Sequence, residues 1–363
     1  MRLLLLKLIF LLSLSLEAQV ELFGIEDQLQ YLTFSADGKH VIGFGNSTFE
    51  QGKPTIYNFI TWDAQTGKEA SKLDIIEEVK KAPFGKDKKL SFSSGVSYCS
   101  MNKGKTQAGF ILNNVINETT GEVYLTLFAI YELATGEIKI ITDKKIQVGS
   151  FCFSTLDPDI LGIVALDNDK VENFAGTYSL TKQAVQKTLF YGKGNFQPIK
   201  MDYTKSGKIV ASFGSNSVLG GFNLYSKAGE LIKKVPLKDH PEQVFEKDNN
   251  LMVVCPNSTY IIDTLTFQIK KTLPKIYIEG VNNIKTVASL VTRENNQDGK
   301  FIYDLNTNKK IEVAKGNSFH SAISPTENKA VYSTNKGQYD YAKGRYVVSE
   351  AEKQKPSAII YSY

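Results

Sequence analysis

The stretch ITWDAQTGKE at residues 60–69 recurs as AIYELATGEI at residues 129–138. Each copy predicts a strand that ends near an aromatic residue and runs into a tight turn. Asp, Thr and Gly favour such turns, because Asp and Thr side chains hydrogen-bond the local backbone and Gly adopts positive φ. A second alternating strand then follows, as in IKII at residues 138–141. Weaker copies stand at residues 177–183, 224–230, 261–267, 302–308 and 347–352.

A second motif precedes most copies and predicts another hairpin. It reads FSADGKHV at residues 34–41, YTKSGKIV at 203–210 and ISPTENKAV at 323–331. Two strands joined by a short polar turn are the signature of a β-hairpin. Looser versions occur at residues 98–104, 153–158 and 245–250. Two hairpins per repeat predict a unit of four antiparallel strands.

The spacing of the copies sets the expected architecture. The anchor positions of the turns are 62, 131, 178, 225, 262, 303 and 348, with steps of 69, 47, 47, 37, 41 and 45 residues. Four-stranded propeller blades occupy about 40–50 residues. We therefore predict an all-β, seven-bladed β-propeller with four-stranded antiparallel blades. Six or eight blades are the alternatives, because the copy at residues 347–352 is weak.

These repeats resemble those of the WD40 and YVTN-type propeller superfamily. In that superfamily a Phe-Ser-x-Asp-Gly hairpin precedes a Trp-Asp-x-x-Thr-Gly turn, and residues 31–67 match the pattern best. Only Trp62-Asp63 reproduces the dipeptide of the family, and the upstream Gly-His pair is missing. The resemblance therefore implies a divergent propeller, closer to the YVTN or quinoprotein type than to a true WD40 protein.

The long first step points to an insertion at about residues 74–89. Residues 75–81 predict a short helix, and a long hairpin is expected around residues 113–121. Insertions in repeat proteins map to loops and often lie on the binding face. The lysines proposed to attract an acidic partner are Lys80, Lys81, Lys86, Lys88 and Lys89. The alternative is a solvated loop that lysine keeps soluble.

The N-terminus has the features of a signal peptide. A short basic start precedes an apolar run that ends at Ala18, so cleavage before Gln19 is expected. Residues 1–18 are too short to span a membrane, and no later segment predicts a transmembrane helix. We expect an exported protein, periplasmic, cell-surface or extracellular, in which residues 19–363 form a single propeller domain.

Charge and cysteine content add few constraints. The 363 residues carry a formal net charge of +5, with lysines scattered through turns, so a nucleic-acid partner is not indicated. Cys99, Cys152 and Cys255 lie far apart in apolar segments. They are expected to be buried free thiols. A disulfide between two of the three cysteines remains an alternative.

Residues suited to catalysis or metal binding are sparse. The three histidines, His40, His240 and His320, lack the spacing of a metal site, although His320 is a candidate for the axial channel. Acidic pairs at residues 157–159 and 167–169, with Glu172 nearby, resemble hairpin tips more than a calcium loop. No catalytic residue, metal or cofactor is predicted.

The sequence thus favours a noncatalytic exported binding or scaffold propeller for a protein or glycan partner. Loops repeated around one rim supply a broad surface for such a partner. The alternative is a propeller enzyme of the lactonase or quinoprotein type with its site in the axial channel. A third reading is a module that binds a cell-surface polymer through lysines. The identity of the partner and the oligomeric state stay open.

Overall fold

The computed structural model describes the chain from Gln19 to Tyr363 with several gaps. The predicted signal peptide at residues 1–18 lies outside the described residues. The ranges described are 19–27, 29–47, 55–194, 196–214, 220–281, 287–294, 297–315, 318, 320–334, 336, 338–340 and 345–363.

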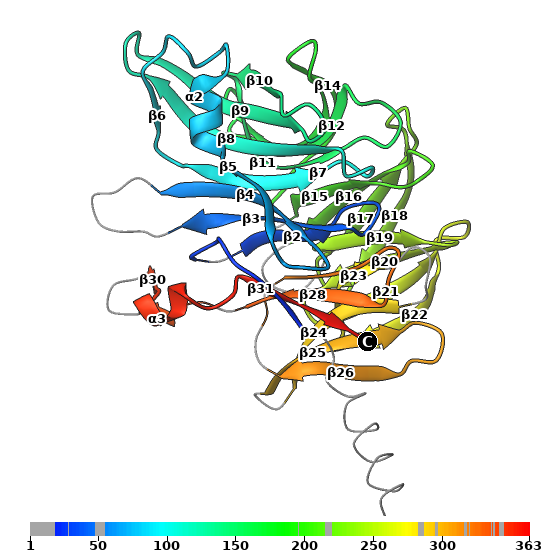
Figure 1. Cartoon of the computed structure of the whole chain (residues 1–363). Coiled ribbons are helices and arrows are strands. Elements are labelled where there is room, and N and C mark those ends of the chain that lie inside the picture. The colour runs from blue at the N-terminus through cyan, green and yellow to red at the C-terminus, as the bar shows by residue number, and fades with distance from the viewer. Residues whose placement is uncertain are drawn as a thin grey trace, which may run out of the picture. The chain divides into compact units, whose positions relative to one another are not determined.

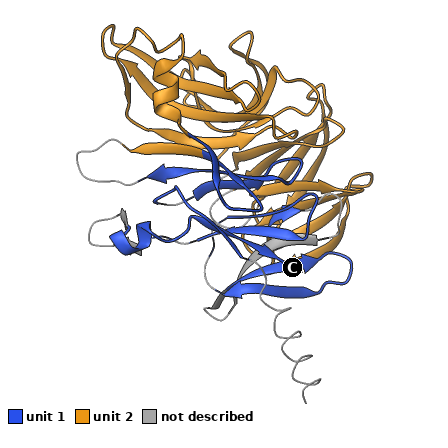
Figure 2. Cartoon of the chain, in the orientation of Figure 1, with its two compact units in different colours: residues 1–48, 60–72, 279–363 blue, residues 49–59, 73–278 orange. Residues whose placement is uncertain are grey.

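Two compact units make up the chain (Figure 2). One unit consists of residues 1–48, 60–72 and 279–363, and the other of residues 49–59 and 73–278. Strands β4 (Ile56–Asp63), β5 (Glu69–Asp74) and β23 (Tyr277–Val281) have residues in both. The two units are described separately below.

The larger unit holds four antiparallel sheets, three of which have four strands in sequence order. These three are β11 to β14, β15 to β18 and β19 to β22, and β6 to β10 form the fourth sheet (Figure 1). The elements are α2 (Ile75–Lys81), β6 (Leu90–Phe92), β7 (Val96–Met101), β8 (Gln107–Asn117), β9 (Glu122–Glu132), β10 (Ile138–Asp143), β11 (Ile146–Phe153), β12 (Ile160–Asp167), β13 (Glu172–Ser179), β14 (Ala184–Tyr191), β15 (Gln197–Tyr203), β16 (Ile209–Gly214), β17 (Gly220–Tyr225), β18 (Leu231–Leu237), β19 (Gln243–Lys247), β20 (Asn250–Cys255), β21 (Ser258–Asp263) and β22 (Ile269–Pro274).

The smaller unit holds the sheet of β1, β31, β28 and β27 and most of the sheets β2 to β5 and β23 to β26. Strands β29 and β30 form a separate two-stranded ribbon. The remaining elements are β1 (Val20–Leu22), β2 (Leu29–Phe34), β3 (His40–Ser47), β24 (Val287–Glu294), β25 (Gln297–Asp304), β26 (Lys310–Lys315), β27 (Ser321–Ile323), β28 (Lys329–Ser333), β29 (Gln338–Asp340), β30 (Arg345–Val347), α3 (Glu350–Lys353) and β31 (Ala358–Ser362).

The predicted number of seven four-stranded blades is wrong. Across the described ranges, six sheets have four strands, and the sheet of β6 to β10 has five. The reason is the length of β8. Residues 108–112 of β8 pair with β7, and residues 115–117 extend further and pair with β6, which follows the insertion. The insertion thus widens one sheet instead of leaving it four-stranded.

The first strands of successive sheets contact one another within each unit. In the larger unit β7 contacts β11, β11 contacts β15, and β15 contacts β19. In the smaller unit β27 contacts β2, the first strand of its sheet, and also β24, the second strand of its sheet. Sheets that meet along their first strands and diverge outward have the arrangement of propeller blades.

The repeated turn forms as the sequence predicts. The Asp63 carboxylate accepts hydrogen bonds from the backbone amides of Gln65 at 3.0 Å and Thr66 at 2.7 Å, and Gly67 has a φ of +70°. Asp263 and Asp304 hold their turns in the same way, through the amides two and three positions later. This shared carboxylate cap explains why the motif could be recognised despite its divergence.

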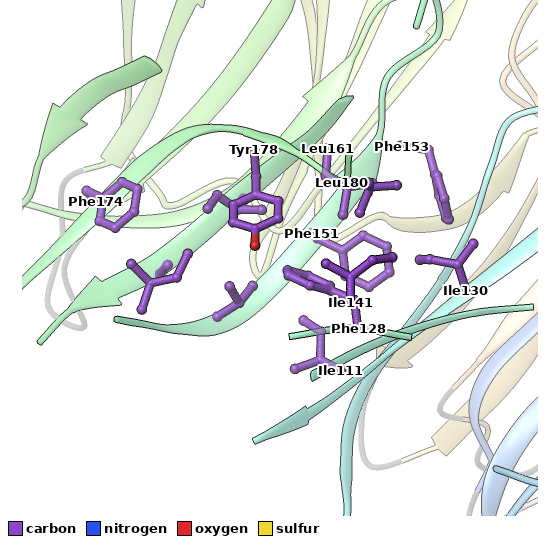
Figure 3. Packing of buried hydrophobic residues seen from close by; sticks show 14 residues of the cluster. Ile111, Phe128, Ile130, Ile141, Phe151, Phe153, Leu161, Phe174, Tyr178 and Leu180 are labelled. Atoms are coloured by element: carbon purple, nitrogen blue, oxygen red, sulfur yellow. The ribbon is translucent and has the colours of Figure 1, made fainter. Parts of the chain in front are cut away.

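Aromatic side chains fill the space between neighbouring sheets of the larger unit (Figure 3). Phe128 of β9 lies 6.0 Å from Phe151 of β11, ring centre to ring centre, and 5.3 Å from Tyr178 of β13. A Cβ atom at Gly109 would lie 2.5 Å from the ring of Phe151. Glycine is needed in β8 because a side chain there would occupy the place of the aromatic core.

The terminal strands complete one sheet together. Strand β1 pairs with β31, which pairs with β28, so segments from both ends of the described chain contribute to the same sheet. The turn predicted at residues 347–352 is wrong, because Ser349 caps helix α3 there. Its hydroxyl accepts from the amide of Glu352, whose carboxylate accepts from the Ser349 amide, and this capping box starts a helix.

Ser357 joins the two terminal segments. Its hydroxyl accepts a hydrogen bond from the Ile25 amide at 3.0 Å and donates one to the Ile25 carbonyl at 2.9 Å. The buried Lys336 ammonium donates to the same carbonyl at 2.6 Å. Ser357 is only 2% exposed, so water does not replace these bonds when they are lost.

We therefore expect Ser357→Ala to lower the free energy of unfolding by about 1–3 kcal/mol, because it leaves buried backbone groups of Ile25 with fewer partners. Urea denaturation followed by circular dichroism measures the loss. Ser71→Ala, at an exposed position of β5, is the control and should change stability by less than about 0.5 kcal/mol. Equal effects of the two substitutions would contradict this role of Ser357.

Candidate functional site

The insertion begins with helix α2, which residues 75–81 form as expected. The Asp74 carboxylate caps it by accepting from the amides of Ile76 at 3.0 Å and Glu77 at 3.4 Å. Ile75 and Val79 are fully buried, and the helix contacts β10. Two apolar side chains on one helical face fix α2 to the sheet, so the insertion is a packed element.

The loop after α2 folds back onto the helix. The amide of Gly85 donates to the Ala82 carbonyl at 2.8 Å, and a Cβ atom at Gly85 would lie 2.3 Å from the Val79 carbonyl oxygen. Any larger residue at this position therefore collides with the helix backbone. This close approach holds Pro83 and Phe84 in place beside the sheet.

A cluster of aromatic rings and ammonium groups fixes the far end of the insertion. Phe84 meets Tyr124 of β9 edge to face at 5.2 Å, and the Lys88 ammonium lies 3.7 Å from the Phe84 ring centre. Glu122 accepts a hydrogen bond from Tyr124 and pairs with Lys144. Burial and this carboxylate raise the pKa of the Tyr124 hydroxyl to about 12. The insertion is therefore held at both ends.

Four of the five lysines proposed for binding have contacts within the protein. Lys86 is exposed, and within the described ranges no ion pair engages it. The contacts are Lys80 with Glu77 at 2.7 Å, Lys81 with Glu78 at 2.8 Å, Lys89 with Glu118 at 2.8 Å and Lys88 over Phe84. The paired carboxylates offset the positive charge that the sequence suggested.

Sequence spacing could have revealed two of these pairs. Residues three apart on a helix face each other, so Glu77–Lys80 and Glu78–Lys81 follow from the helix prediction. The partner of Lys89 could not be found in this way. Glu118 lies in the β8–β9 turn, and only the pairing of β6 with β8 brings it close.

A groove of about 820 Å³ lies beside the insertion. Its lining comes mainly from two segments that are separate in the sequence, the end of α2 with its loop and the β9–β10 hairpin, and Gln107 of β8 adds to it. The lining residues are Glu78, Lys81, Ala82, Pro83, Phe84, Gln107, Ile130, Glu132, Thr135, Glu137, Ile138, Lys139 and Ile140. Of the five predicted lysines, the groove includes Lys81.

The groove combines aliphatic walls with carboxylates. Ile130, Ile138 and Ile140 supply apolar surface, while Glu132 and Glu137 stand at either end of the β9–β10 turn. Within the part of the chain that the structure describes, neither of these two carboxylates forms an ion pair or hydrogen bond. A site of this composition suits binding through apolar contact and charge.

Two first strands of the sheets carry a buried carboxyl group. These groups matter for the alternative prediction of a propeller enzyme, because carboxyls can serve in catalysis. In the larger unit, burial raises the pKa of Asp202 to about 6, and the Val244 amide donates to its carboxylate. In the smaller unit, burial raises the pKa of Glu279 to about 8, opposed by hydrogen bonds from the hydroxyl and amide of Ser321. Each carboxyl thus joins its strand to the first strand of the following sheet.

The three histidines lie apart from the groove. His40 starts β3, and its amide donates to the Ser35 hydroxyl at 3.0 Å. Burial lowers the pKa of His320, which precedes β27, to about 4. His240 lies between the carboxylates of Asp239 at 3.4 Å and Glu242 at 3.5 Å.

The acidic segments proposed as hairpin tips accept hydrogen bonds from turn residues, Asp167 within its own turn and Asp159 from the β13–β14 turn. Asp159 accepts from the Thr181 amide at 2.7 Å and from the Ser179 hydroxyl at 2.6 Å. Asp167 accepts from the Asp169 amide at 3.1 Å and from the Lys170 amide at 3.3 Å. These bonds give both carboxylates a structural role in closing turns.

The cysteines are free and buried, as expected. Burial raises the pKa of Cys99, Cys152 and Cys255 above that of an ordinary thiol. A thiol is a weak nucleophile until it ionises, so these side chains act as apolar packing groups. The alternative of a disulfide between two of these cysteines is therefore wrong.

Comparison with solved structures identifies the fold of the chain. No protein family matches the sequence, and no curated protein is significantly similar to it. Among solved structures, the β-propeller domain of Cps50 (Swd1) from Myceliophteria thermophila aligns with a TM-score of 0.60 at 10% identity, over 94% of this chain and 98% of that one.

Two peptidases also align. The β-propeller domain of the trilobed protease from Pyrococcus furiosus has a TM-score of 0.50 and 12% identity, over 84% of this chain and 88% of that one. The acylaminoacyl peptidase of Pyrococcus horikoshii has a TM-score of 0.53 and 11% identity, over 84% of this chain and 48% of that one.

These alignments and the four-stranded antiparallel sheets define the chain as an all-β protein with the β-propeller fold. At such low identity they establish the fold alone, and WD40 repeats are not identified by any family match. None of the helices among the described residues is long and apolar enough to cross a membrane.

We expect Gly85→Ala to open the insertion, because the new methyl group collides with the α2 backbone. Overpacking of this kind costs about 1–3 kcal/mol locally, so trypsin cleavage after Lys86, Lys88 and Lys89 should accelerate by roughly tenfold. Limited proteolysis with mass spectrometry measures the rate. The control is Gly104→Ala, in a lysine-flanked turn where a Cβ atom has no contact closer than 3.9 Å. Equal cleavage in both variants would contradict the packed loop.

We expect Glu279→Gln to change the pH dependence of stability. Between the ordinary pKa of 4.5 and the folded value of about 8, the folded state holds a proton that the unfolded state has lost. The contribution of the Glu279 carboxyl to the free energy of unfolding therefore falls as the pH rises through that window. Gln cannot ionise, so the variant should lose less stability between pH 5 and pH 8 than the wild type, measured by urea denaturation. The control variant Glu312→Gln, at an exposed position of β26, should show the same pH dependence of stability as the wild type. Parallel profiles for wild type and Glu279→Gln would refute the pKa assignment.

Proposed function

We propose that the chain is an exported, noncatalytic binding or scaffold propeller for a protein or glycan partner. We further propose that the partner contacts the insertion at residues 74–89 and the β9–β10 hairpin. The groove of about 820 Å³ between these segments is the observation that carries the proposal. Its volume lies within the range of about 300–1,000 Å³ found for ligand pockets, and aliphatic walls with a few polar groups are typical of such sites.

The packing of the insertion supports a preformed surface. Helix α2 is fixed by two buried side chains, and the loop is fixed by Gly85 and by the contact of Phe84 with Tyr124. A surface that is ordered before binding loses less conformational entropy when the partner arrives. In this proposal Lys80, Lys81, Lys86, Lys88 and Lys89 border the surface. Four of them stabilise the insertion, and Lys86 is exposed to solvent.

The alternative of a propeller enzyme has weaker support. Asp202 and Glu279 are the buried carboxyls on first strands that such a site would use, but both accept hydrogen bonds from the next sheet. The similarity to peptidases concerns the fold, and the chain spans about half of the acylaminoacyl peptidase. Binding therefore accounts for more of the site than catalysis does.

A photo-crosslinking residue at position 83 tests the proposal. Pro83 is exposed and lines the groove, so benzoylphenylalanine placed there should capture a partner of defined mass in the native exported fraction. In that fraction N-terminal sequencing should find Gln19 first. The same residue at Lys227, exposed in the β17–β18 turn of another sheet, is the control. No adduct at position 83, or equal adducts at both positions, would contradict the proposed surface.

A further inference from the structure

We propose that the groove binds an extended segment of a partner protein that presents a lysine or arginine between aliphatic residues. This inference rests on the proposed function and names the chemistry of the partner. It assigns the recognition of charge to Glu132 and Glu137, which the sequence did not single out. The predicted acidic partner would instead have used the lysines.

The charges around the groove favour a basic ligand. Glu78 and Lys81 neutralise each other through an ion pair of 2.8 Å. Glu132, Glu137 and Lys139 remain as the other charged lining residues, so the groove has an excess of one carboxylate in a chain whose formal net charge is +5. Carboxylates that line a groove attract cations and disfavour anionic partners through like-charge repulsion.

The apolar lining determines what must flank the basic residue. Ile130, Ile138 and Ile140 present aliphatic surface, and Ala82 and Pro83 supply small apolar groups on the side of the insertion. Aliphatic side chains on either side of a lysine or arginine bury apolar area against these walls. The long aliphatic stem of the basic side chain adds to that area while its charged end reaches the carboxylates.

The position of β10 favours an extended backbone. In the sheet order β10-β9-β8-β6, strand β10 is at the end, and no other strand of the described chain pairs with its outer edge. Ile138, Lys139 and Ile140 of this strand line the groove. An exposed strand edge is a common docking place for an extended peptide, which supplies backbone hydrogen bonds as well as side-chain contacts.

A protein partner fits the groove better than a glycan does. Sugar rings commonly stack on exposed aromatic faces, and Phe84 is the aromatic residue of the lining. Its ring already meets Tyr124 at 5.2 Å and the Lys88 ammonium at 3.7 Å. The groove therefore offers aliphatic and carboxylate chemistry, which matches a basic peptide segment.

Two heptapeptides that differ in one charge test the inference. STVKVTS and STVEVTS, each carrying the same neutral fluorophore, are titrated with the mature protein and followed by fluorescence anisotropy. STVKVTS should bind about fivefold more tightly, the effect expected when two exposed carboxylates each contribute a modest charge interaction. The preference should weaken in high salt, because exposed charges are screened.

Substitution of the carboxylates locates the effect. The double variant Glu132→Gln, Glu137→Gln keeps the side-chain shape, and the preference for STVKVTS should disappear. Glu230→Gln is the matched control, because Glu230 follows Gly229 in its turn as Glu137 follows Gly136. The control should retain the full preference. Unchanged circular dichroism in the double variant shows that the fold is intact.

The outcomes separate this inference from the proposed function. Equal or tighter binding of STVEVTS, a preference that survives in the double variant, or no binding of either peptide up to about 1 mM overturns the inference. If position 83 still crosslinks a partner in those cases, the binding surface stands and only the basic segment is refuted. Binding of maltoheptaose without binding of either peptide also overturns the inference and leaves the glycan form of the proposed function.

Discussion

The packing of one sheet face against the next is the constraint on which the rest of the structure depends. A four-stranded sheet is stable only when an apolar face is buried against another element. Between β8–β10 and β11–β13 this is achieved by Phe128, Phe151 and Tyr178, with Gly109 leaving room for a ring. Because each sheet is buried by its neighbours, the sequence must repeat, and that repeat made the fold recognisable.

The repeat also explains where polar groups can be buried. Asp202 and Glu279 each accept hydrogen bonds from the first strand of the following sheet, and burial makes both carboxyls harder to ionise. Outer strands are joined by a similar device. The Lys187 ammonium donates a hydrogen bond to the Ala228 carbonyl at 2.7 Å. The Lys233 ammonium donates one to the Thr266 carbonyl at 2.9 Å. Side chains thus join sheets that the backbone alone would leave separate.

The sequence predicted the parts of the fold that local chemistry determines. The turn at Asp63 and the helix at residues 75–81 were expected, because a turn cap and a helical pattern can be recognised over a few residues. The turn expected at residues 347–352 failed, since the capping box of Ser349 and Glu352 outweighed a weak likeness to the repeat. The fifth strand, β6, was missed because its partner is more than twenty residues away.

The candidate site was only partly predictable, for the same reason. Its insertion was visible as a break in the repeat, but the groove needs the β9–β10 hairpin as its second wall, and no sequence spacing relates Glu132 to Pro83. The lysines were conspicuous in the sequence, whereas their pairing with carboxylates depends on helix register and strand pairing. A count of charges along a loop therefore overstates the cations available to a partner. In this chain most of the lysines of the insertion stabilise its structure, and the groove that they help to hold carries the opposite charge.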